Sequence, residues 1–568
     1  MDNIVFLIFR RMRRPLLTLL VIYSVSVLGL VLIPGVDDQG NVWHMGFFHA
    51  IYFISYTSTT IGFGEIPYAF TDAQRLWVTI TMYAGVIGWL YAISNILTLV
   101  QDATFQQALA ERKLARNIRG MREPFYLVCG YGETGSALVR GLTDVGQHVV
   151  VIEIDEFRSN LTKLDNLRDF VPVLQGDAQK PLHLQEAGLE NPLCQAVVAV
   201  TNDNEANLKI AITSKLLHPH IKVICRADSH DVEKNMASFG TDYIIDPYDT
   251  FALYLITAFQ APCLYILQRW LYTGRREARL EEPVYPPQNS HWIICGFGRF
   301  GQAVYKRMLK EGLDVIIVEA NPDIPGLPDK GVVEGRGTEA DTLQQAGVET
   351  ACGLIAGTDN DANNLSIVVT ARDLNPDLFF VVRQNHSDNS AVIDAVNADI
   401  VMQPSQIIAE KIRVLLGTPM LYDFISLAAY QENEWACELF SRISALVGSH
   451  PPQLIEIGVN ESSATAVHHH LTQGGTVTLG ELLRDPWSRD ASLRCMVLML
   501  YRRNEHRLLP SDETEIKLQD RLLVCAGKGG FTRLFWNLQQ DNILSYIRTG
   551  EVNKHGWLWH HLTRYRSR

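Results

Sequence analysis

Residues 59–65, TTIGFGE, combine two glycines with small or apolar side chains, which suits a segment whose backbone does the chemistry. Glycine lacks the Cβ that would obstruct a backbone whose carbonyl oxygens point at one axis, and such oxygens can replace the hydration shell of a potassium ion. Thr60 can add its hydroxyl at the inner mouth. In a soluble protein the same pattern favours a tight turn, so the flanks decide its meaning. The candidate potassium ligands are Thr60, Ile61, Gly62, Phe63 and Gly64.

Two apolar runs flank this segment. Residues 16–33 and 76–100 carry no charged side chain, and each is long enough to cross a hydrocarbon core of about 30 Å as a helix. Residues 46–58 are too short to cross, so the predicted order is helix, re-entrant pore helix, filter, helix. Irregular backbone at membrane depth is tolerated only inside protein or beside water, which four copies around one axis would provide. A signal peptide is the alternative for the first run, but no small-residue cleavage site follows it before Pro34.

Basic residues predict the orientation of the two helices. They precede the first run and follow the second, and both groups favour the cytoplasmic side. Two crossings satisfy both groups, so we expect a multi-pass inner (plasma) membrane protein whose larger part is cytoplasmic. The basic residues are Arg10, Arg11, Arg13 and Arg14 before the first run, and Arg112, Lys113, Arg116, Arg119 and Arg122 after the second.

Three residues of the second run are candidates for a gate. Gly85 and Gly88 either let the helix bend or let it pack closely, and the sequence favours neither role. Leu97, near the inner end of the run, is a candidate for a hydrophobic constriction.

An internal repeat organises the rest of the chain. Residues 125–155 and 291–321 share the pattern of apolar strand, glycine loop, helix and second strand. Further along, TNDNEANL at Thr201 returns as TDNDANNL at Thr358. Apolar runs that alternate with amphipathic helical stretches predict, in each copy, an α/β Rossmann-like fold with an open parallel sheet.

Each copy carries the glycine pattern of a dinucleotide-binding fold. The pattern follows a strand, opens a helix and is followed, 23 residues after its first glycine, by Glu153 or Glu319. The first two glycines let backbone amides approach a pyrophosphate, and the acid can accept hydrogen bonds from ribose hydroxyls. We therefore predict that NAD or another adenine nucleotide binds, the alternative being a copy that only keeps the fold. The glycines are Gly130, Gly132 and Gly135 in the first copy, and Gly296, Gly298 and Gly301 in the second.

The copies differ around their glycine loops. Arg299 is a candidate phosphate ligand, whereas its counterpart Glu133 would repel phosphate and either binds a divalent cation or, as we favour, faces solvent. Asp177 and Arg336, at the third strand of each copy, are further candidate nucleotide contacts. Acidic residues near the clefts either bind calcium or interact with helix N-termini; they are Asp203, Glu205, Asp359 and Asp361.

Composition excludes some other functions. The net charge of −12 argues against a nucleic-acid partner. Nine cysteines form no CxxC pair, so we expect reduced core residues in a cytoplasmic compartment. The adjacent histidines at 468–470 cannot all face one metal on a helix or strand, which favours a surface loop over a zinc site.

The filter, the two helices and the duplicated folds together resemble prokaryotic two-transmembrane potassium channels with tandem RCK (KTN, TrkA-N-like) domains. The resemblance implies a homotetramer in the lipid bilayer, with a cytoplasmic ring of eight RCK folds whose ligand-driven expansion pulls the inner helices apart. It implies potassium in the filter, a nucleotide as the regulatory ligand, calcium as a further candidate ligand, and no enzymatic activity.

The filter departs from the commonest pattern of that family, TVGYGD, at Ile61, Phe63 and Glu65. Phe63 lacks the hydroxyl that can brace a filter from behind, and we still expect selectivity for potassium over sodium. Two other functions stay open: a membrane-anchored NAD-dependent oxidoreductase and a poorly selective ligand-gated cation channel.

The predicted domain order ends with a small α+β lobe that resembles the C-terminal lobe of many RCK folds. The apolar stretch that begins at Tyr248 is bracketed by Asp246, Asp249 and Arg269, so we predict a helical crossover there rather than a third membrane span. The predicted parts are the cytoplasmic N-terminus 1–15, the pore domain 16–100, a linker 101–122, the first RCK N-lobe 123–247, a crossover and linker 248–288, the second RCK N-lobe 289–404, a second crossover 405–445, the C-terminal lobe 446–530 and a helical tail 531–568.

Overall fold

The computed structural model describes residues 2–102, 116–118, 120–273, 282–448 and 452–551 of the 568-residue chain. The chain divides into two compact units, Met1–Asn117 and Ile118–Arg568. Several predicted features lie outside the described residues: the side chains of Arg10 and Arg11, the residues Arg112, Lys113 and Arg119, and the tail beyond residue 551.

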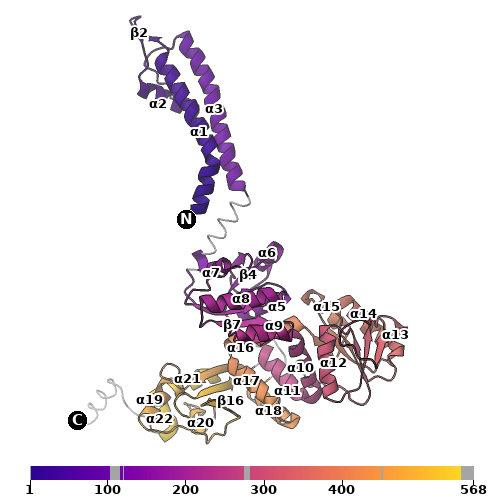
Figure 1. Cartoon of the computed structure of the whole chain (residues 1–568). Helices are drawn as coiled ribbons and strands as arrows, with labels where there is room; N and C mark the ends of the chain where they lie inside the picture. The colour runs from indigo at the N-terminus through magenta and orange to yellow at the C-terminus, as the bar shows by residue number, and fades with distance from the viewer. Residues whose placement is uncertain (1, 103–115, 119, 274–281, 449–451, 552–568) are drawn as a thin grey trace, which may run out of the picture. The chain divides into compact units, whose positions relative to one another are not determined.

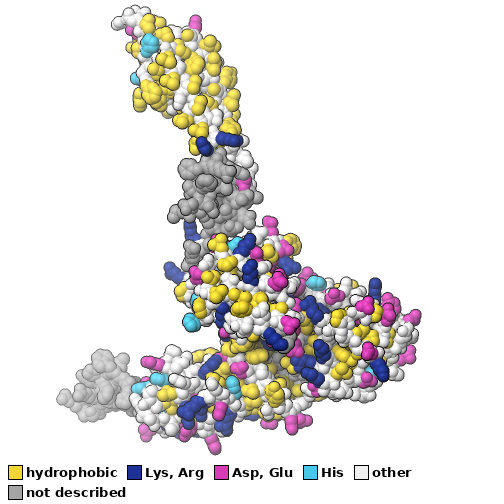
Figure 2. Space-filling model, in the orientation of Figure 1, with side chains coloured by type: hydrophobic (Ala, Val, Ile, Leu, Met, Phe, Trp, Pro, Cys, Tyr) yellow, Lys and Arg dark blue, Asp and Glu magenta, His cyan; other side chains and the backbone are white. Residues whose placement is uncertain are grey.

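The smaller unit has the predicted order of helix, short helix, filter and helix (Figure 1). Two of its helices are long and apolar enough to cross a membrane, over Met12–Leu32 and Asp72–Thr98. Hydrophobic side chains cover most of its visible face, whereas the larger unit shows both signs of charge (Figure 2). The elements are α1 (Asp2–Leu32), β1 (Gly35–Val36), β2 (Val42–Trp43), α2 (Phe47–Ser58) and α3 (Asp72–Gln101).

Close packing explains the two glycines of α3. A Cβ on Gly85 would lie 2.6 Å from the Ser58 hydroxyl oxygen at the end of α2, and a Cβ on Gly88 would lie 2.8 Å from Ile22 Cδ1 of α1. The helix runs without a break through both positions. The structure thus favours the packing role of these glycines over the hinge.

Each copy of the repeat forms a six-stranded parallel sheet with helices on its faces. The strand orders are β5-β4-β3-β6-β7-β8 and β11-β10-β9-β12-β13-β14. Successive strands are therefore added toward one edge of the sheet up to β5 or β11, and toward the other edge from β6 or β12 onward. The point of change lies between β3 and β6 in the first sheet and between β9 and β12 in the second. Ligands of open α/β sheets bind outside the carboxyl ends of strands at such a switch point. The first copy contains β3 (Phe125–Cys129), α5 (Glu133–Asp144), β4 (His148–Glu153), α6 (Glu156–Leu164), β5 (Val173–Gln175), α7 (Pro181–Glu186), β6 (Cys194–Ala199), α8 (Asn204–Leu217), β7 (Lys222–Arg226), α9 (His230–Ser238) and β8 (Tyr243–Ile245). The second contains β9 (Trp292–Cys295), α12 (Arg299–Lys310), β10 (Val315–Glu319), β11 (Val332–Glu334), α13 (Ala340–Gln345), β12 (Gly353–Ala356), α14 (Asp361–Leu374), β13 (Phe379–Arg383), η1 (Ser387–Asn389), α15 (Ser390–Ala395) and β14 (Ile400–Met402).

The helices that follow the two sheets are exchanged between them. Helix α10 comes after the first sheet but packs on α12 of the second, where the Phe251 and Phe300 rings lie 4.4 Å apart between centroids. Helix α16 comes after the second sheet but packs on α5 of the first, and its Ile408 and Ile412 are part of that lobe's core. Each lobe is therefore completed by a helix from the other. The connecting helices are α10 (Pro247–Gln260), α11 (Pro262–Thr273), α16 (Pro404–Gly417), α17 (Pro419–Ala428) and α18 (Asn433–Val447).

The C-terminal lobe is a four-stranded antiparallel sheet with four helices. It extends beyond the predicted end at residue 530, because Leu538 and Ile547 are fully buried in its core. The histidines at 468–470 lie on α19 and not on the predicted loop; His469 faces Asp541 and His470 contacts Arg548. The elements are β15 (Gln453–Gly458), α19 (Thr465–Thr472), α20 (Leu479–Leu482), β16 (Cys495–Arg502), β17 (Glu505–Leu508), β18 (Arg521–Ala526), α21 (Gly530–Gln539) and α22 (Asp541–Thr549).

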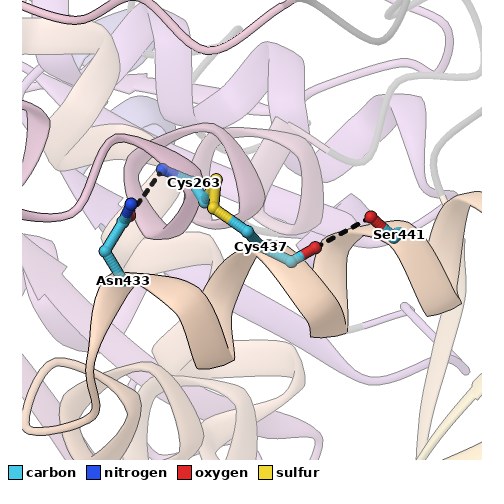
Figure 3. Close-up of a disulfide and its surroundings, with 4 residues drawn as sticks. All are labelled: Cys263, Asn433, Cys437 and Ser441. Atoms are coloured by element: carbon cyan, nitrogen blue, oxygen red, sulfur yellow. Dashed lines mark hydrogen bonds between the residues drawn. A yellow bond between two sulfur atoms is a disulfide. The ribbon is translucent and has the colours of Figure 1, made fainter.

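A disulfide joins Cys263 of α11 to Cys437 of α18 (Figure 3). The prediction of nine reduced cysteines is wrong for this pair, because the packing of α11 on α18 brings together two residues that are 174 positions apart in sequence. The other seven cysteines are buried thiols. Burial raises the pKa of Cys225, Cys295 and Cys525 to about 12, as expected for unreactive core thiols.

Candidate functional site

The first candidate site is the segment 59–65, which joins α2 to α3. The backbone is left-handed at every second residue: Thr60, Gly62 and Gly64 have positive φ angles of 60°, 63° and 75°. A left-handed residue at every second position turns successive peptide planes, and Gly62 and Gly64 reach this conformation without the steric cost that a Cβ adds at Thr60. The Ile61 and Phe63 side chains are exposed by 61% and 62% in the single chain. The predicted filter is thus an irregular backbone segment suited to presenting carbonyl oxygens.

The pore helix α2 holds this segment at its outer end. The Tyr56 hydroxyl donates to the Glu65 carbonyl at 2.9 Å, and the Tyr52 hydroxyl donates to the Glu65 carboxylate at 3.2 Å. The Phe63 ring lies parallel to Tyr52, with centroids 6.4 Å apart, and edge-on to Tyr56 at 5.9 Å. Two tyrosines of α2 therefore supply hydroxyls that Phe63 lacks. Sequence reasoning missed them, although their spacing of four residues places both on one helix face.

The second candidate site is a cleft of about 340 Å³ in the first lobe, at the carboxyl ends of its central strands. Four of the predicted nucleotide contacts line this cleft, namely Gly130, Gly132, Glu153 and Asp177, and the predicted acid Asp203 lines it as well. The third glycine of the motif has another role, since a Cβ on Gly135 would lie 2.0 Å from the Gly130 carbonyl oxygen. Gly301 and Gly296 repeat this close approach in the second lobe.

The predicted ribose acids also hold the glycine loops. Glu153 is 4% exposed and accepts hydrogen bonds from the backbone amides of Tyr131, at 2.5 Å, and Asp155, at 2.9 Å. Glu319 accepts in the same way from Phe297, at 2.5 Å, and Asn321, at 3.0 Å. An ionised carboxylate has about four acceptor positions, so each acid can also accept from a ribose hydroxyl.

Arg158 of α6 lines the first cleft and was not predicted from the sequence. Its Nη1 atom lies 3.4 Å from the position of a Cβ built on Gly132, beside the loop that would face a pyrophosphate. Its guanidinium forms neither an ion pair nor a hydrogen bond with any residue that the structure describes. The only sequence signal was a basic residue in the first turn of the helix after Glu153.

Arg299 and Glu133 contact partners that were not predicted from the sequence. The Arg299 guanidinium pairs with Asp228 of the first lobe at 3.1 Å and lies 4.8 Å from the centroid of the Tyr248 ring. Glu133 faces His386 of the second lobe at 3.4 Å rather than solvent alone. The two loop residues therefore make reciprocal contacts between the lobes.

The remaining predicted residues are less informative. Arg336 is exposed just after β11. A Cβ on Gly298 would meet no atom within 4 Å. Leu97 is exposed on α3 in the single chain.

The acidic residues near the clefts stabilise local backbone. Asp203 caps α8 by accepting from the Glu205 amide at 2.9 Å. Burial disfavours the charged form of Asp361, but hydrogen bonds from Asn389, Asn385 and His386 outweigh this effect and lower the pKa of its carboxyl. Within the described part of the chain, no three histidine, cysteine or acidic side chains gather as metal ligands.

Comparison with protein families matches both parts of the chain. Residues 16–102 match the ion channel family, and residues 126–247 and 292–404 each match the TrkA-N domain. The chain therefore joins an ion channel domain to two TrkA-N (RCK) domains.

Individual relatives of this RCK-domain channel chain match only over part of its length. An uncharacterised protein of Methanothermus fervidus is 31% identical over 40% of the chain and 35% of the relative. Potassium channel protein 1 of Methanocaldococcus jannaschii is 27% identical over 36% of the chain and 59% of the relative. Voltage-gated potassium channel Kch of Escherichia coli is 28% identical over 24% and 35%. The chain thus spans between about a third and three fifths of the length of these relatives.

The solved structures that match the chain are more distant in sequence. The GsuK channel bound to NAD has a TM-score of 0.47 and 16% identity over 94% of this chain and 100% of its own. GsuK bound to ADP has a TM-score of 0.43 and 20% identity over 73% and 99%. Scores below 0.5 do not establish a shared arrangement of domains.

Proposed function

We propose that the chain forms a homotetrameric potassium channel of the inner membrane, opened or closed by a nucleotide such as NAD or ADP bound to cytoplasmic RCK folds. The observation that carries the proposal is the filter segment between α2 and α3, whose left-handed positions alternate and whose outer end is held by Tyr52 and Tyr56. In a tetramer, four such segments would surround one axis with carbonyl oxygens.

The first lobe is the better candidate for the nucleotide site. Its cleft of about 340 Å³ lies within the usual range for small-molecule sites, of roughly 300–1,000 Å³. The Gly132 amide region and Arg158 would bind the pyrophosphate, and Glu153 would accept from the ribose. We leave Arg299 out of the proposed site, because its guanidinium pairs with Asp228 and does not line this cleft.

The exchanged helices provide a route for coupling. Because α10 and α16 each complete the other lobe's core, a ligand that moves one lobe must also move the helix that leads from the other. Two RCK folds per chain would supply eight per tetramer. A movement of this ring would reach α3 through the segment of chain that joins α3 to the first RCK fold. A ligand shifts such an equilibrium only through its differential affinity for the two states.

Single-channel recording of purified protein in a planar bilayer tests the proposal. With unequal potassium and sodium on the two sides, we expect a reversal potential near that of potassium and an open probability that changes when NAD, NADH, ADP or ATP is added to the RCK side. Adding calcium separately tests it as a further ligand. A reversal potential that responds equally to sodium would instead indicate a poorly selective cation channel.

NADH oxidation measured on the same preparation tests the remaining alternative. Steady turnover without current would support a membrane-anchored oxidoreductase and overturn the channel proposal.

A further inference from the structure

A second cavity lies among the four helices that connect the lobes, α10, α11, α16 and α17. Its volume is about 90 Å³, far smaller than that of the nucleotide cleft, and most of its lining is aliphatic or aromatic. A buried water needs roughly 10–15 Å³ of such space, so the cavity has room for several waters or one small organic molecule. A nucleotide would not fit.

One cation faces this cavity, from Lys411 of α16. Its ammonium donates to the Thr250 hydroxyl at 3.2 Å and lies 5.5 Å from the centroid of the Tyr422 ring. An ammonium has three donors, and this is its one hydrogen bond to a described residue. Burial lowers the pKa of Lys411, as expected for a charge removed from water.

The acids closest to Lys411 have other partners. Asp249 forms a bidentate ion pair with Arg307, at 2.7 and 2.9 Å, and Asp246 caps α10 through the amides of Tyr248 and Asp249. No carboxylate of the described chain lies within ion-pair distance of the Lys411 ammonium. A partly buried cation without a counter-ion is unfavourable, and an anion that enters the cavity would remove that cost.

We infer that this cavity binds a small organic carboxylate, with Lys411 as its counter-ion and the Thr250 hydroxyl as a neighbouring polar contact. A single ammonium matches the single charge of a carboxylate, whereas a phosphate carries up to two charges and no second cation is found among the described residues that line the cavity. Leu253, Leu264 and Ile425 would contact a short hydrocarbon chain. Since helices from both crossovers form the walls, an occupied cavity would connect α10 and α11 to α16 and α17. The site is separate from the nucleotide cleft and does not depend on its assignment.

Butyrate and butyramide, which have nearly the same size but differ in charge, test this inference. Thermal unfolding and calorimetric titration of the full-length protein in detergent measure their effects. We expect butyrate, and not butyramide, to raise the unfolding temperature of the wild type. Lys411→Met should bind butyrate at least about tenfold more weakly, because a hydrogen-bonded charge pair is lost. Lys310→Met, which removes an exposed lysine from α12, should respond like the wild type.

A second variant keeps the lysine but blocks the cavity. Ser426 is exposed at the edge of the cavity, so Ser426→Phe should fold and should also abolish the butyrate response. An equal response to butyrate and butyramide, or a full butyrate response in both Lys411→Met and Ser426→Phe, would overturn the inference.

Discussion

The guanidinium of Arg299 in the second lobe lies 3.1 Å from the carboxylate of Asp228 in the first. At the equivalent position of the first lobe, Glu133 faces His386 of the second. The glycine loop of the first lobe thus carries an acid and that of the second lobe a base. Each of these side chains contacts a residue of the other lobe. This pairing accounts for the difference between the two repeats at this position, and it gives Arg299 a partner other than the predicted phosphate.

Nucleotide affinity should distinguish two arginines of similar chemistry. We expect Arg158→Gln to weaken NAD or ADP binding about tenfold, because a charge-assisted contact to phosphate contributes roughly 1.5–3 kcal/mol. Arg299→Gln should leave the affinity within about twofold of the wild type, because the Arg299 side chain, which is 61% exposed, pairs with Asp228 and does not line the first cleft. Calorimetric titration of both variants measures this. A larger loss in Arg299→Gln would restore the original sequence-based assignment.

The filter brace should be needed for selectivity. Tyr56→Phe removes the hydroxyl that donates to the Glu65 carbonyl, and we expect shorter openings and a lower potassium-to-sodium permeability ratio. Tyr23→Phe is the matched control, because it removes a tyrosine hydroxyl that accepts from Trp89 between α1 and α3, away from the filter. Single-channel recordings in mixed potassium and sodium measure both effects. Unchanged selectivity in Tyr56→Phe would show that Phe63 is adequately supported without this hydrogen bond.

Packing at Gly85 can be tested by rescue. Gly85→Ala should destabilise the pore unit by about 1–3 kcal/mol, because its Cβ would overlap the side chain of Ser58. Adding Ser58→Gly removes the overlapping atoms and should recover part of the loss. Thermal unfolding of the single and double variants in detergent measures this. If Gly85 acts as a hinge instead, Gly85→Ala should alter gating without a stability loss that Ser58→Gly can reverse.

The disulfide predicts a defined thiol count. Titrated under denaturing conditions, the oxidised protein should show seven thiols, and reduction should add the two of Cys263 and Cys437. Reduction should also lower stability by about 2–4 kcal/mol, as is typical of a disulfide that closes a long loop. Thiol titration and thermal unfolding with and without reductant measure these effects. Cys263→Ser should have the stability of the reduced protein with and without reductant.

The sequence by itself determined the two membrane helices and the two Rossmann-like folds. Uncharged apolar runs specify α1 and α3, because a helix that crosses a membrane must be apolar along its length. The repeated glycine patterns and alternating strands and helices specify two Rossmann-like sheets, and the 23-residue spacing places Glu153 and Glu319 beside their glycine loops. These features depend on residues close together in the chain, where backbone geometry limits the outcome.

Only the tertiary structure decided which distant residues meet. Three features depend on how helices and strands pack after they form. They are the exchange of α10 and α16, the pairing of Arg299 with Asp228, and the disulfide across 174 residues. A guanidinium or a thiol can pair with any suitable group that packing brings within reach, so residue type alone does not name the partner. The same holds for Tyr56 and Arg158: the sequence places each on a helix, but the fold decides which loop that helix face meets.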